Sequence, residues 1–242
     1  MPKELFSAAS ADDLAREAAG RFVEAAGAAV AEHGRFSVAL SGGSTPRRLY
    51  GLLAQPPYVH AVDWSRVHIF FADERFVPHD HPDSTMLLAR ETLLDRVAIP
   101  PENLFPMPTV GVTPEVGAEQ YAASLKAFFG TDLPRFDLVL LGMGPDGHTA
   151  SLFPGFPDYP GSVAAVHGSP KPPPVRLTLT LEAINHAARI LFLATGADKA
   201  GPLRAVFAEP APGPESLPAA RVEAANGHTA WLVDRDAGSA LS

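Results

Sequence analysis

The sequence predicts an α/β fold: a Rossmann-like open, mostly parallel sheet with helices on both faces. Short segments that are apolar at nearly every position alternate with longer stretches of helical periodicity, which is typical of strands buried on both faces. In four cases a polar, Gly-rich or charged cluster follows the apolar segment directly. Because ligands of open α/β sheets bind outside the carboxyl ends of the strands, we expect these four clusters to line one cleft.

Local signals define the first helix and strand. The Ala-rich stretch at 11–32 carries its charges on one side and predicts an amphipathic helix that ends near Gly34. The apolar run FSVAL at 36–40 predicts a short buried strand, which a serine and two glycines end. Thr45 as N-cap and Pro46 as first helical residue are expected to open the next helix.

The same alternation continues along the chain. Further strands are expected at 67–71 (VHIFF), 137–144 (DLVLLGMG), 189–196 (RILFLATG) and 229–234 (TAWLVD), and the segment VRLTLTL is strand-like. Helices are expected at 83–96, 114–129, 181–186 and 199–207, the last before a proline-rich loop at 209–218. No internal repeat of fixed period interrupts this series.

Composition narrows the class of protein. The 242 residues are 46% hydrophobic, enough to bury a sizeable core, and we expect residues 1–242 to form a single domain. There is no cysteine, which excludes disulfides, thiolate metal sites and a cysteine nucleophile. The formal charge of -8 disfavours a nucleic-acid partner, whereas an anionic small molecule needs only a local positive site. Without a secretory-signal pattern or a bilayer-length apolar run, we expect a cytoplasmic location and no membrane partner.

The segment SGGSTP has the features of a phosphate-binding loop. Glycines let backbone amides converge, hydroxyls donate hydrogen bonds, and the dipole of a following helix favours an anion. The candidate phosphate-binding residues are Ser41, Gly42, Gly43, Ser44 and Thr45. The Gly-Lys-Ser/Thr ending of a Walker loop is missing, and a plain strand-to-helix turn is the alternative interpretation.

The segment GMGPDGHTASLFPG holds the strongest candidate for a catalytic base. Its Gly-x-Gly-x-x-Gly pattern does not open directly into a helix, which makes dinucleotide binding the weaker interpretation. His148 follows a strand end, and an imidazole with a pKa of about 6.5 is a competent general base at neutral pH. Asp146, two residues earlier, is placed to orient His148 or to stabilise its charged form. The alternative is a turn aspartate beside a structural histidine.

The segment ADERF places charges at another strand end. Arg75 is a candidate for contacting phosphate or the oxyanion of a hydrolytic reaction, with Asp73 or Glu74 holding it in place. A structural ion pair is the alternative. The following segment HDHPD has two histidines and two acids but no complete ligand set, so we predict no metal site there.

Three further cations are candidates for binding an anion. Lys171 and Arg176 flank prolines before VRLTLTL, and Lys199 opens a helix after RILFLATG. A lysine at a helix N-terminus opposes the helix dipole, so this placement favours a bound anion beside Lys199. A solvated surface lysine is the alternative interpretation.

The segments SGGSTP, ADERFVP, GPDGHTASLFPG, SPKPPPVRLTLT and ATGADKA, in this order and spacing, resemble the 6-phosphogluconolactonase family. The resemblance implies a Rossmann-like sheet shared with glucosamine-6-phosphate deaminases, and hydrolysis of 6-phospho-glucono-1,5-lactone without a cofactor. It implies that His148 activates water with help from Asp146 and that Arg75 lies near the reacting centre. Phosphate and substrate would be received by Ser41, Gly42, Gly43, Ser44, Thr45, Asp73, Lys171, Arg176 and Lys199.

One position departs from the family pattern, and rival functions remain open. The family commonly has Asn and an aromatic residue where this chain has Thr85 and Met86. A glucosamine-6-phosphate deaminase is the nearest rival, but that family carries a glutamate where this chain has Phe153. A non-catalytic sugar-phosphate sensor would need the phosphate loop but not His148, and a nicotinamide-dependent enzyme would bind NAD or NADP saturably.

Overall fold

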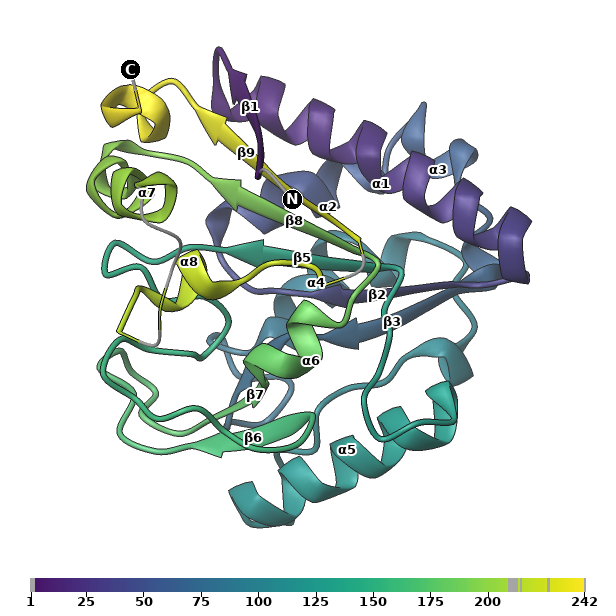
Figure 1. Cartoon of the computed structure of the whole chain (residues 1–242). Coiled ribbons are helices and arrows are strands. Elements are labelled where there is room, and N and C mark those ends of the chain that lie inside the picture. Colours follow the sequence, from purple (N-terminus) through teal and green to yellow (C-terminus); the bar gives the residue numbers. More distant parts are fainter. Residues whose placement is uncertain (1–2, 209–212, 214, 226, 242) are drawn as a thin grey trace.

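A six-stranded parallel sheet forms the centre of the computed structural model, which describes residues 3–208, 213, 215–225 and 227–241 (Figure 1). The strand order is β1-β9-β8-β5-β2-β3, and every neighbouring pair is parallel. The strands are β1 (Glu4–Ala8), β2 (Phe36–Leu40), β3 (Val67–Phe71), β5 (Leu138–Gly142), β8 (Arg189–Ala194) and β9 (His228–Asp234). The predicted α/β class with a mostly parallel sheet is therefore confirmed.

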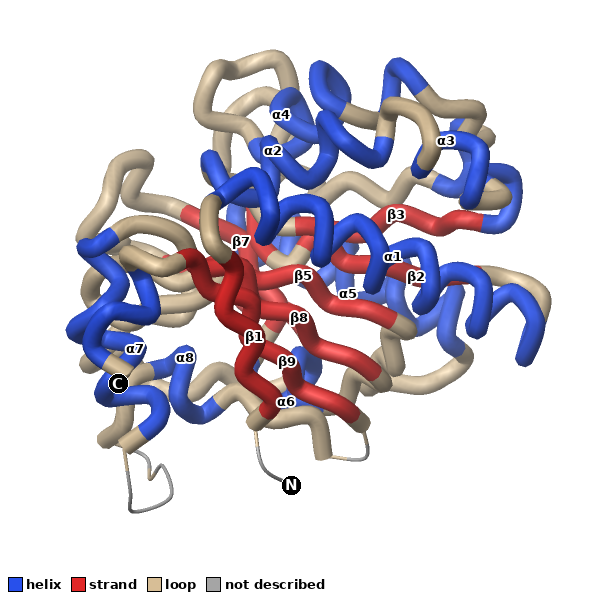
Figure 2. The backbone as a smooth tube through the Cα atoms, turned by 90° about the horizontal axis from the view of Figure 1, so that it is seen from above, coloured by secondary structure: helices blue, strands red, loops and turns tan. Residues whose placement is uncertain are grey.

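Helices lie on both faces of this sheet. The longer ones are α1 (Ala11–His33), α2 (Ser44–Leu53), α4 (Thr85–Thr92), α5 (Pro114–Phe129) and α7 (Ala200–Phe207), and the short ones are α3 (Tyr58–Ala61), α6 (Leu181–Asn185) and α8 (Pro218–Arg221). Helices α1 and α2 lie on one face, and α5 and α6 lie on the other (Figures 1 and 2). Helix α1 ends at Gly34, whose φ of 81° suits a residue without a side chain, as predicted.

A second, antiparallel sheet of three short strands was not predicted. Its order is β4-β7-β6, from β4 (Asp73–Arg75), β7 (Arg176–Leu179) and β6 (Val163–Val166). The charged segment DER carries no strand signal of its own and is extended because it pairs with β7. This pairing sets Arg75 opposite Arg176, so it brings two candidate site residues together from distant parts of the chain.

Several predicted boundaries were wrong. Thr45 is not the N-cap of α2: the helix begins at Ser44 after Gly43, and the Thr45 hydroxyl instead shares a hydrogen bond with that of Thr195 (2.8 Å). Lys199 ends a short 3-10 turn, and α7 begins one residue later. The helix expected at 83–96 is shorter, and Ser84 caps it. The expected proline-rich loop at 209–218 falls partly on residues 209–212 and 214, outside the described residues.

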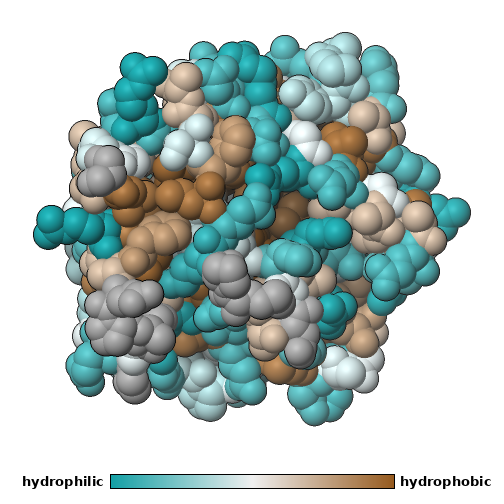
Figure 3. Space-filling model, turned by 45° about the horizontal axis from the view of Figure 1, so that its top comes forward, coloured by the Kyte–Doolittle hydropathy of each residue, from teal (hydrophilic) through white to brown (hydrophobic). Residues whose placement is uncertain are grey.

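Edge strand β1 was also missed, because its five residues are mostly exposed and pair with β9 alone. The core lies between the sheet and its helices, where Trp231 stacks on Phe192 with ring centroids 3.7 Å apart. Hydrophilic side chains cover much of the face in Figure 3, with apolar ones between them. Within the described residues, no helix has both the length and the apolar character needed to cross a membrane.

Candidate active site

The predicted clusters meet in one pocket of about 280 Å³ outside the carboxyl ends of the strands. Its lining comes from the loops after β2, β5 and β8, from strand β4, and from the segment before and at the start of β7. The lining residues are Ser41, Gly42, Gly43, Ser44, Thr45, Pro46, Asp73, Arg75, Gly142, Met143, Gly144, Pro145, His148, Ala150, Lys171, Arg176, Leu193 and Lys199. The expectation that these clusters share a cleft is confirmed, while the role of each residue stays a prediction.

The loop after β2 presents the N-terminus of α2 to the pocket. Gly43 has a φ of 114°, a conformation that favours glycine, and it turns the chain into the helix. Among the residues that the structure describes, no side chain caps this helix, and its first turn holds no acidic residue. The first backbone N–H groups of α2 are therefore left for an anion, and the helix dipole favours one there.

Ser41 differs from its neighbours in this loop. Its hydroxyl donates to the backbone oxygen of Leu140 (2.8 Å), and its backbone N–H donates to the hydroxyl of Tyr50 (3.2 Å). Both donors are thus used inside the protein, although Ser41 lines the pocket. The geometry gives Ser41 a role in fixing the loop to strand β5 and leaves anion contacts to the four residues after it.

His148 is held by Asp146 in the turn after β5. The imidazole Nδ1 and the Asp146 Oδ1 are 2.5 Å apart, so Nδ1–H donates a hydrogen bond to Asp146, and Nε2 carries the free lone pair. On Gly144, a Cβ would lie 2.0 Å from His148 Nδ1 and 2.5 Å from the Asp146 carboxylate. Gly144 thus permits the pair to form, a role that the Gly-x-Gly-x-x-Gly pattern did not reveal.

Burial and charge shift the pKa of His148 in opposite directions. Burial lowers this pKa and has the largest effect, the hydrogen bond and charge of Asp146 raise it, and the charge of Lys171 lowers it. The Phe153 ring, 4.9 Å from the imidazole between centroids, contributes to the burial. For Asp146, burial raises the pKa, but the hydrogen bond and charge of His148 outweigh it, so the net pKa is lowered. Asp146 is therefore ionised at neutral pH, and the neutral form of His148 is favoured.

Arg75 reaches the pocket, but its predicted acidic partners do not hold it. Its Nη1 donates to the backbone oxygen of Asp83 (2.7 Å). Glu74 accepts from the backbone N–H of Arg75 but does not bond its guanidinium. At the start of α4 it accepts from the backbone N–H groups of Thr85 and Met86 and from the Ser84 hydroxyl. Asp73 accepts from the Ser151 hydroxyl. The expectation that Asp73 or Glu74 holds the Arg75 guanidinium was wrong, because a buried carboxylate at a helix start is satisfied by the helix amides.

Arg176 is the most buried of the pocket cations, at 5% exposed. Its Nε and Nη2 donate to the backbone oxygens of the preceding proline-rich segment: Lys171 (3.1 Å), Pro172 (3.3 Å) and Pro173 (3.1 Å). Its Nη1 lies 3.9 Å from Asp73 Oδ2. The prolines therefore shape a turn whose carbonyls hold this guanidinium at the pocket wall.

The two lysines complete the positive lining. Lys199 bonds the carboxylate of its neighbour Asp198, and its side chain is 17% exposed. Lys171 lines the same pocket, and its charge acts on His148. Both predicted cations therefore face the same space as the N-terminus of α2.

Two positions that the sequence singled out lie outside the pocket lining: Thr85, which departs from the family pattern, and the histidine-containing segment that begins at His79. The Thr85 hydroxyl is buried without a hydrogen-bond partner among the described residues, and a Cβ on Gly42 would lie 2.9 Å from it. Thr85 thus packs behind the phosphate loop rather than lining the pocket. His79 Nε2 bonds the backbone oxygen of Met107 (2.8 Å), and no group of three or more candidate metal ligands occurs in the part of the chain that the structure describes.

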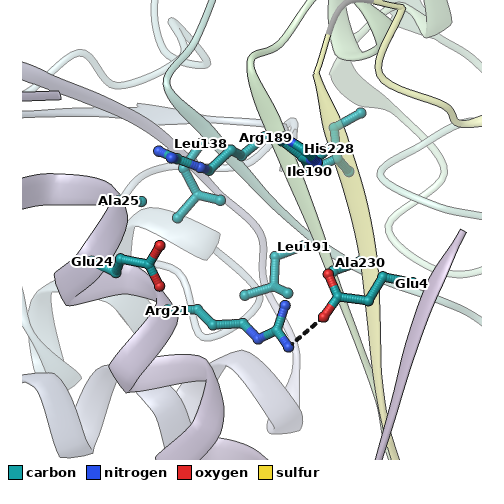
Figure 4. Close-up of a pocket in the computed structure, with 10 residues that line it drawn as sticks. All are labelled: Glu4, Arg21, Glu24, Ala25, Leu138, Arg189, Ile190, Leu191, His228 and Ala230. Atoms are coloured by element: carbon teal, nitrogen blue, oxygen red, sulfur yellow. Dashed lines mark hydrogen bonds and ion pairs between the residues drawn. The ribbon is translucent and has the colours of Figure 1, made fainter. Parts of the chain in front are cut away.

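A second pocket of about 260 Å³ lies at the amino ends of the strands, beside α1 (Figure 4). Its floor is apolar, and its rim carries charged side chains. Arg21 bonds Glu4 (2.7 Å) and Glu17 (2.8 Å), and Glu24 and Arg189 make no ion pair within the described residues. We name this the amino-edge pocket. It contains His228, to which no carboxylate of the described part of the chain is bonded, so it lacks a held base.

The family model of glucosamine-6-phosphate isomerases/6-phosphogluconolactonase matches residues 9–231. The chain belongs to this family. The 6-phosphogluconolactonase of Synechocystis sp. is 43% identical over 216 residues, covering 88% of each chain. A probable chloroplastic 6-phosphogluconolactonase 3 of Oryza sativa subsp. indica is 41% identical, over 95% of this chain and 73% of the relative. The family resemblance of the sequence motifs is confirmed.

Solved structures agree with this assignment. The 6-phosphogluconolactonase from Trypanosoma cruzi aligns with a TM-score of 0.89 at 30% identity, over 100% of this chain and 97% of that chain. The enzyme from Thermotoga maritima aligns with a TM-score of 0.83 at 30% identity, over 97% and 100% of the two chains. A monomeric glucosamine-6-phosphate deaminase aligns with a TM-score of 0.81 at 20% identity, which shows a shared fold alone.

Proposed function

We propose that this protein hydrolyses 6-phospho-D-glucono-1,5-lactone to 6-phospho-D-gluconate, the lactonase step of the oxidative pentose phosphate pathway. The relatives that match most of the chain are named 6-phosphogluconolactonases. One observation carries the proposal: a histidine held by a carboxylate faces the same pocket as an uncapped helix N-terminus and four cations. A base and an anion site in one pocket fit a phosphorylated ester whose carbonyl lies at the far end from its phosphate.

In this scheme His148 is the general base. Its Nε2 takes a proton from water as the water oxygen bonds to the lactone carbonyl carbon, and Asp146 stabilises the resulting imidazolium. The carbonyl oxygen becomes an oxyanion, for which Arg75 supplies positive charge. When the intermediate collapses, the bond to the ring oxygen breaks and that oxygen takes the proton from His148. The new carboxylic acid ionises, so each turnover releases one proton at neutral pH.

The phosphate supplies the binding energy that orients the lactone. We assign it to the backbone amides at the start of α2, the hydroxyls of Ser44 and Thr45, and the side chains of Arg176 and Lys199. Lys171 lies close enough to His148 to affect its charge and is assigned to the substrate rather than to the phosphate alone. Binding a remote dianion fixes the reacting carbon near the base, which is how non-reacting groups contribute to rate.

No step of this scheme uses a metal or cofactor, since a lactone carbonyl is already electrophilic.

We further propose that residues 1–242 act as a single 6-phosphogluconolactonase-like domain, located in the cytoplasm. Its partner would be a sugar-phosphate lactone, and it would bind neither nucleic acid nor membrane. Some relatives are named chloroplastic, and fractionation of the source cell tests the location.

The test is acid release from freshly generated 6-phosphogluconolactone by the purified protein, without added metal or cofactor. We expect a rate well above spontaneous hydrolysis that saturates with substrate. A rate equal to the spontaneous one would reject the proposal. Ammonia release from glucosamine 6-phosphate would instead support the deaminase, and saturable binding of NAD or NADP would support the nicotinamide-dependent enzyme.

A further inference from the structure

The pocket holds one negative charge among its cations. Of the described residues that line it, Asp73 alone carries a carboxylate. A phosphate and a developing oxyanion are both repelled by such a group, so its presence calls for a different kind of ligand atom. A neutral hydroxyl, which donates a hydrogen bond, is the substrate group that an anionic acceptor suits.

One oxygen of this carboxylate is fixed by the protein. The Ser151 hydroxyl donates to Asp73 Oδ2 (2.8 Å), and Arg176 Nη1 lies 3.9 Å from the same oxygen. Ser151 is fully buried, and its own backbone N–H donates to the hydroxyl of Thr178 (3.2 Å) on β7. Ser151 therefore joins the His148 turn to Asp73 on β4 through its hydroxyl and to Thr178 on β7 through its backbone N–H.

The other oxygen is left for a ligand. Asp73 Oδ1 accepts no hydrogen bond from any residue that the structure describes, although the side chain is only 9% exposed. Oδ1 is not among the described polar atoms that are buried without a partner, so it borders open space. A substrate hydroxyl that donates to it there would form a hydrogen bond to a charged acceptor. The carboxylate is thus turned so that one oxygen is held and the second faces the pocket that Asp73 lines.

The position of Asp73 indicates which part of the substrate it meets. It accepts a hydrogen bond from Ser151 (2.8 Å), which lies in the same turn as His148, so the carboxylate is joined to the turn that carries the base. Its charge also acts on His148, whose pKa is lowered most by burial and raised by Asp73. Asp73 therefore lies toward the base. If the lactone carbonyl is at His148, the hydroxyl nearest Asp73 is on a carbon close to that carbonyl.

We propose that Asp73 accepts a hydrogen bond from the hydroxyl next to the lactone carbonyl, and that Ser151 is the positioning residue that turns its carboxylate toward that hydroxyl. This inference rests on the proposed lactonase activity. Ser151, which does not line the pocket, would thus help the protein to distinguish the hydroxylated lactone from one that lacks this hydroxyl. Sites that hydrogen-bond a substrate hydroxyl reject the analogue that lacks it, because their polar group is left unpaired.

The test compares 6-phosphogluconolactone with its 2-deoxy analogue, each generated in place from the matching sugar 6-phosphate. For the wild type, kcat/KM is expected to be roughly 10-fold to 100-fold higher for the hydroxylated lactone, the range of a hydrogen bond to a charged group. S151A and D73N are expected to lower kcat/KM for the hydroxylated lactone by a larger factor than kcat/KM for the 2-deoxy lactone, because only the first substrate loses a hydrogen bond. The preference should therefore shrink in both variants.

The preference is a ratio, so a variant that is partly unfolded lowers both rates and leaves the ratio unchanged. S37A is the matched control, because Ser37 is also a buried serine that donates to a carboxylate, Asp137 (2.7 Å), but at the other edge of the sheet. It should keep the wild-type preference.

Each remaining outcome has a defined meaning. An unchanged preference in S151A, with both rates lowered equally, would make Ser151 merely structural and overturn its assignment. A wild type that hydrolyses both lactones equally well would overturn the role of Asp73 while leaving the lactonase proposal intact. A wild type that hydrolyses neither would reject the proposed function itself.

Discussion

Pockets of similar volume lie at the two ends of the parallel strands, about 280 Å³ at the carboxyl ends and about 260 Å³ at the amino ends. We refer to these two sides of the sheet as the carboxyl edge and the amino edge. Both pockets have charged linings. At the carboxyl edge the N-terminus of α2 is uncapped, and Asp146 holds His148. At the amino edge Arg21 is bonded on both sides by glutamates, and His228 is exposed (Figure 4).

Neither the volume of a pocket nor the presence of charged side chains therefore identifies the candidate active site. What distinguishes the carboxyl ends is the start of α2, which no described side chain caps, together with four cations and one base that a carboxylate holds in the same pocket. A parallel sheet produces this asymmetry, because the helices that follow its strands begin at the carboxyl edge, where their dipoles favour anions. Substitutions in matched pairs, one at each edge, test this comparison.

The largest effect is expected for His148→Ala. Loss of the general base should lower kcat by roughly 100-fold to 10,000-fold with a modest change in KM. The matched change at the amino edge, His228→Ala, should leave both parameters within about twofold of wild type. Steady-state kinetics on the lactone measure kcat and KM of both variants. Equal losses of kcat in the two would contradict the assignment of the base to the carboxyl edge.

Gly144→Ala is expected to be nearly as damaging. The added Cβ would lie 2.0 Å from His148 Nδ1, so the imidazole and Asp146 must move. A displacement of about 1 Å at a reacting group costs on the order of 100-fold in rate. Gly51→Ala in α2, where a Cβ meets nothing within 4 Å, is the control and should keep wild-type activity. Full activity in Gly144→Ala would show that the pair does not need its observed geometry.

Lys199→Ala tests the cations. Removing a charged donor from the phosphate should raise KM by roughly 10-fold to 100-fold, with a smaller effect on kcat. Arg189→Ala removes a cation from the amino-edge pocket and should leave KM unchanged. Inhibition by the product 6-phosphogluconate provides a second readout, and it should weaken in Lys199→Ala alone.

The smallest effects are shifts of the pH profile. The base works in its neutral form, so kcat/KM falls as pH drops through the pKa of His148. Asp146 raises this pKa and Lys171 lowers it. Asp146→Asn should therefore move the acidic limb to lower pH, and Lys171→Met should move it to higher pH. Shifts in the same direction in both variants would contradict the assignment of His148 as the titrating base.

Much of this architecture was predictable from local sequence. The apolar runs of β2, β3, β5, β8 and β9 identify the core of the sheet, and the rule that ligands bind at carboxyl ends of strands grouped the loops. Helix α5 was predicted to the residue, because Thr113 and Pro114 mark its start and Gly130 its end. These signals are contained within a few neighbouring residues.

What could not be predicted depends on distant pairing. Strand β4 is extended only because β7 lies beside it, and Glu74 serves α4 rather than Arg75 because the chain folds back on itself. Ser151 meets Asp73 across 78 positions of sequence. Such contacts join residues that carry no local signal for each other, so only coordinates reveal them.

The most direct test of the central claim is backbone amide hydrogen exchange with and without 6-phosphogluconate. We expect slower exchange at 42–45, 142–148 and 196–199, where the loops at the carboxyl ends meet, and no change at 189–191 and 228–230, which line the amino-edge pocket. Protection at the amino edge, with none in the loop before α2, would contradict it.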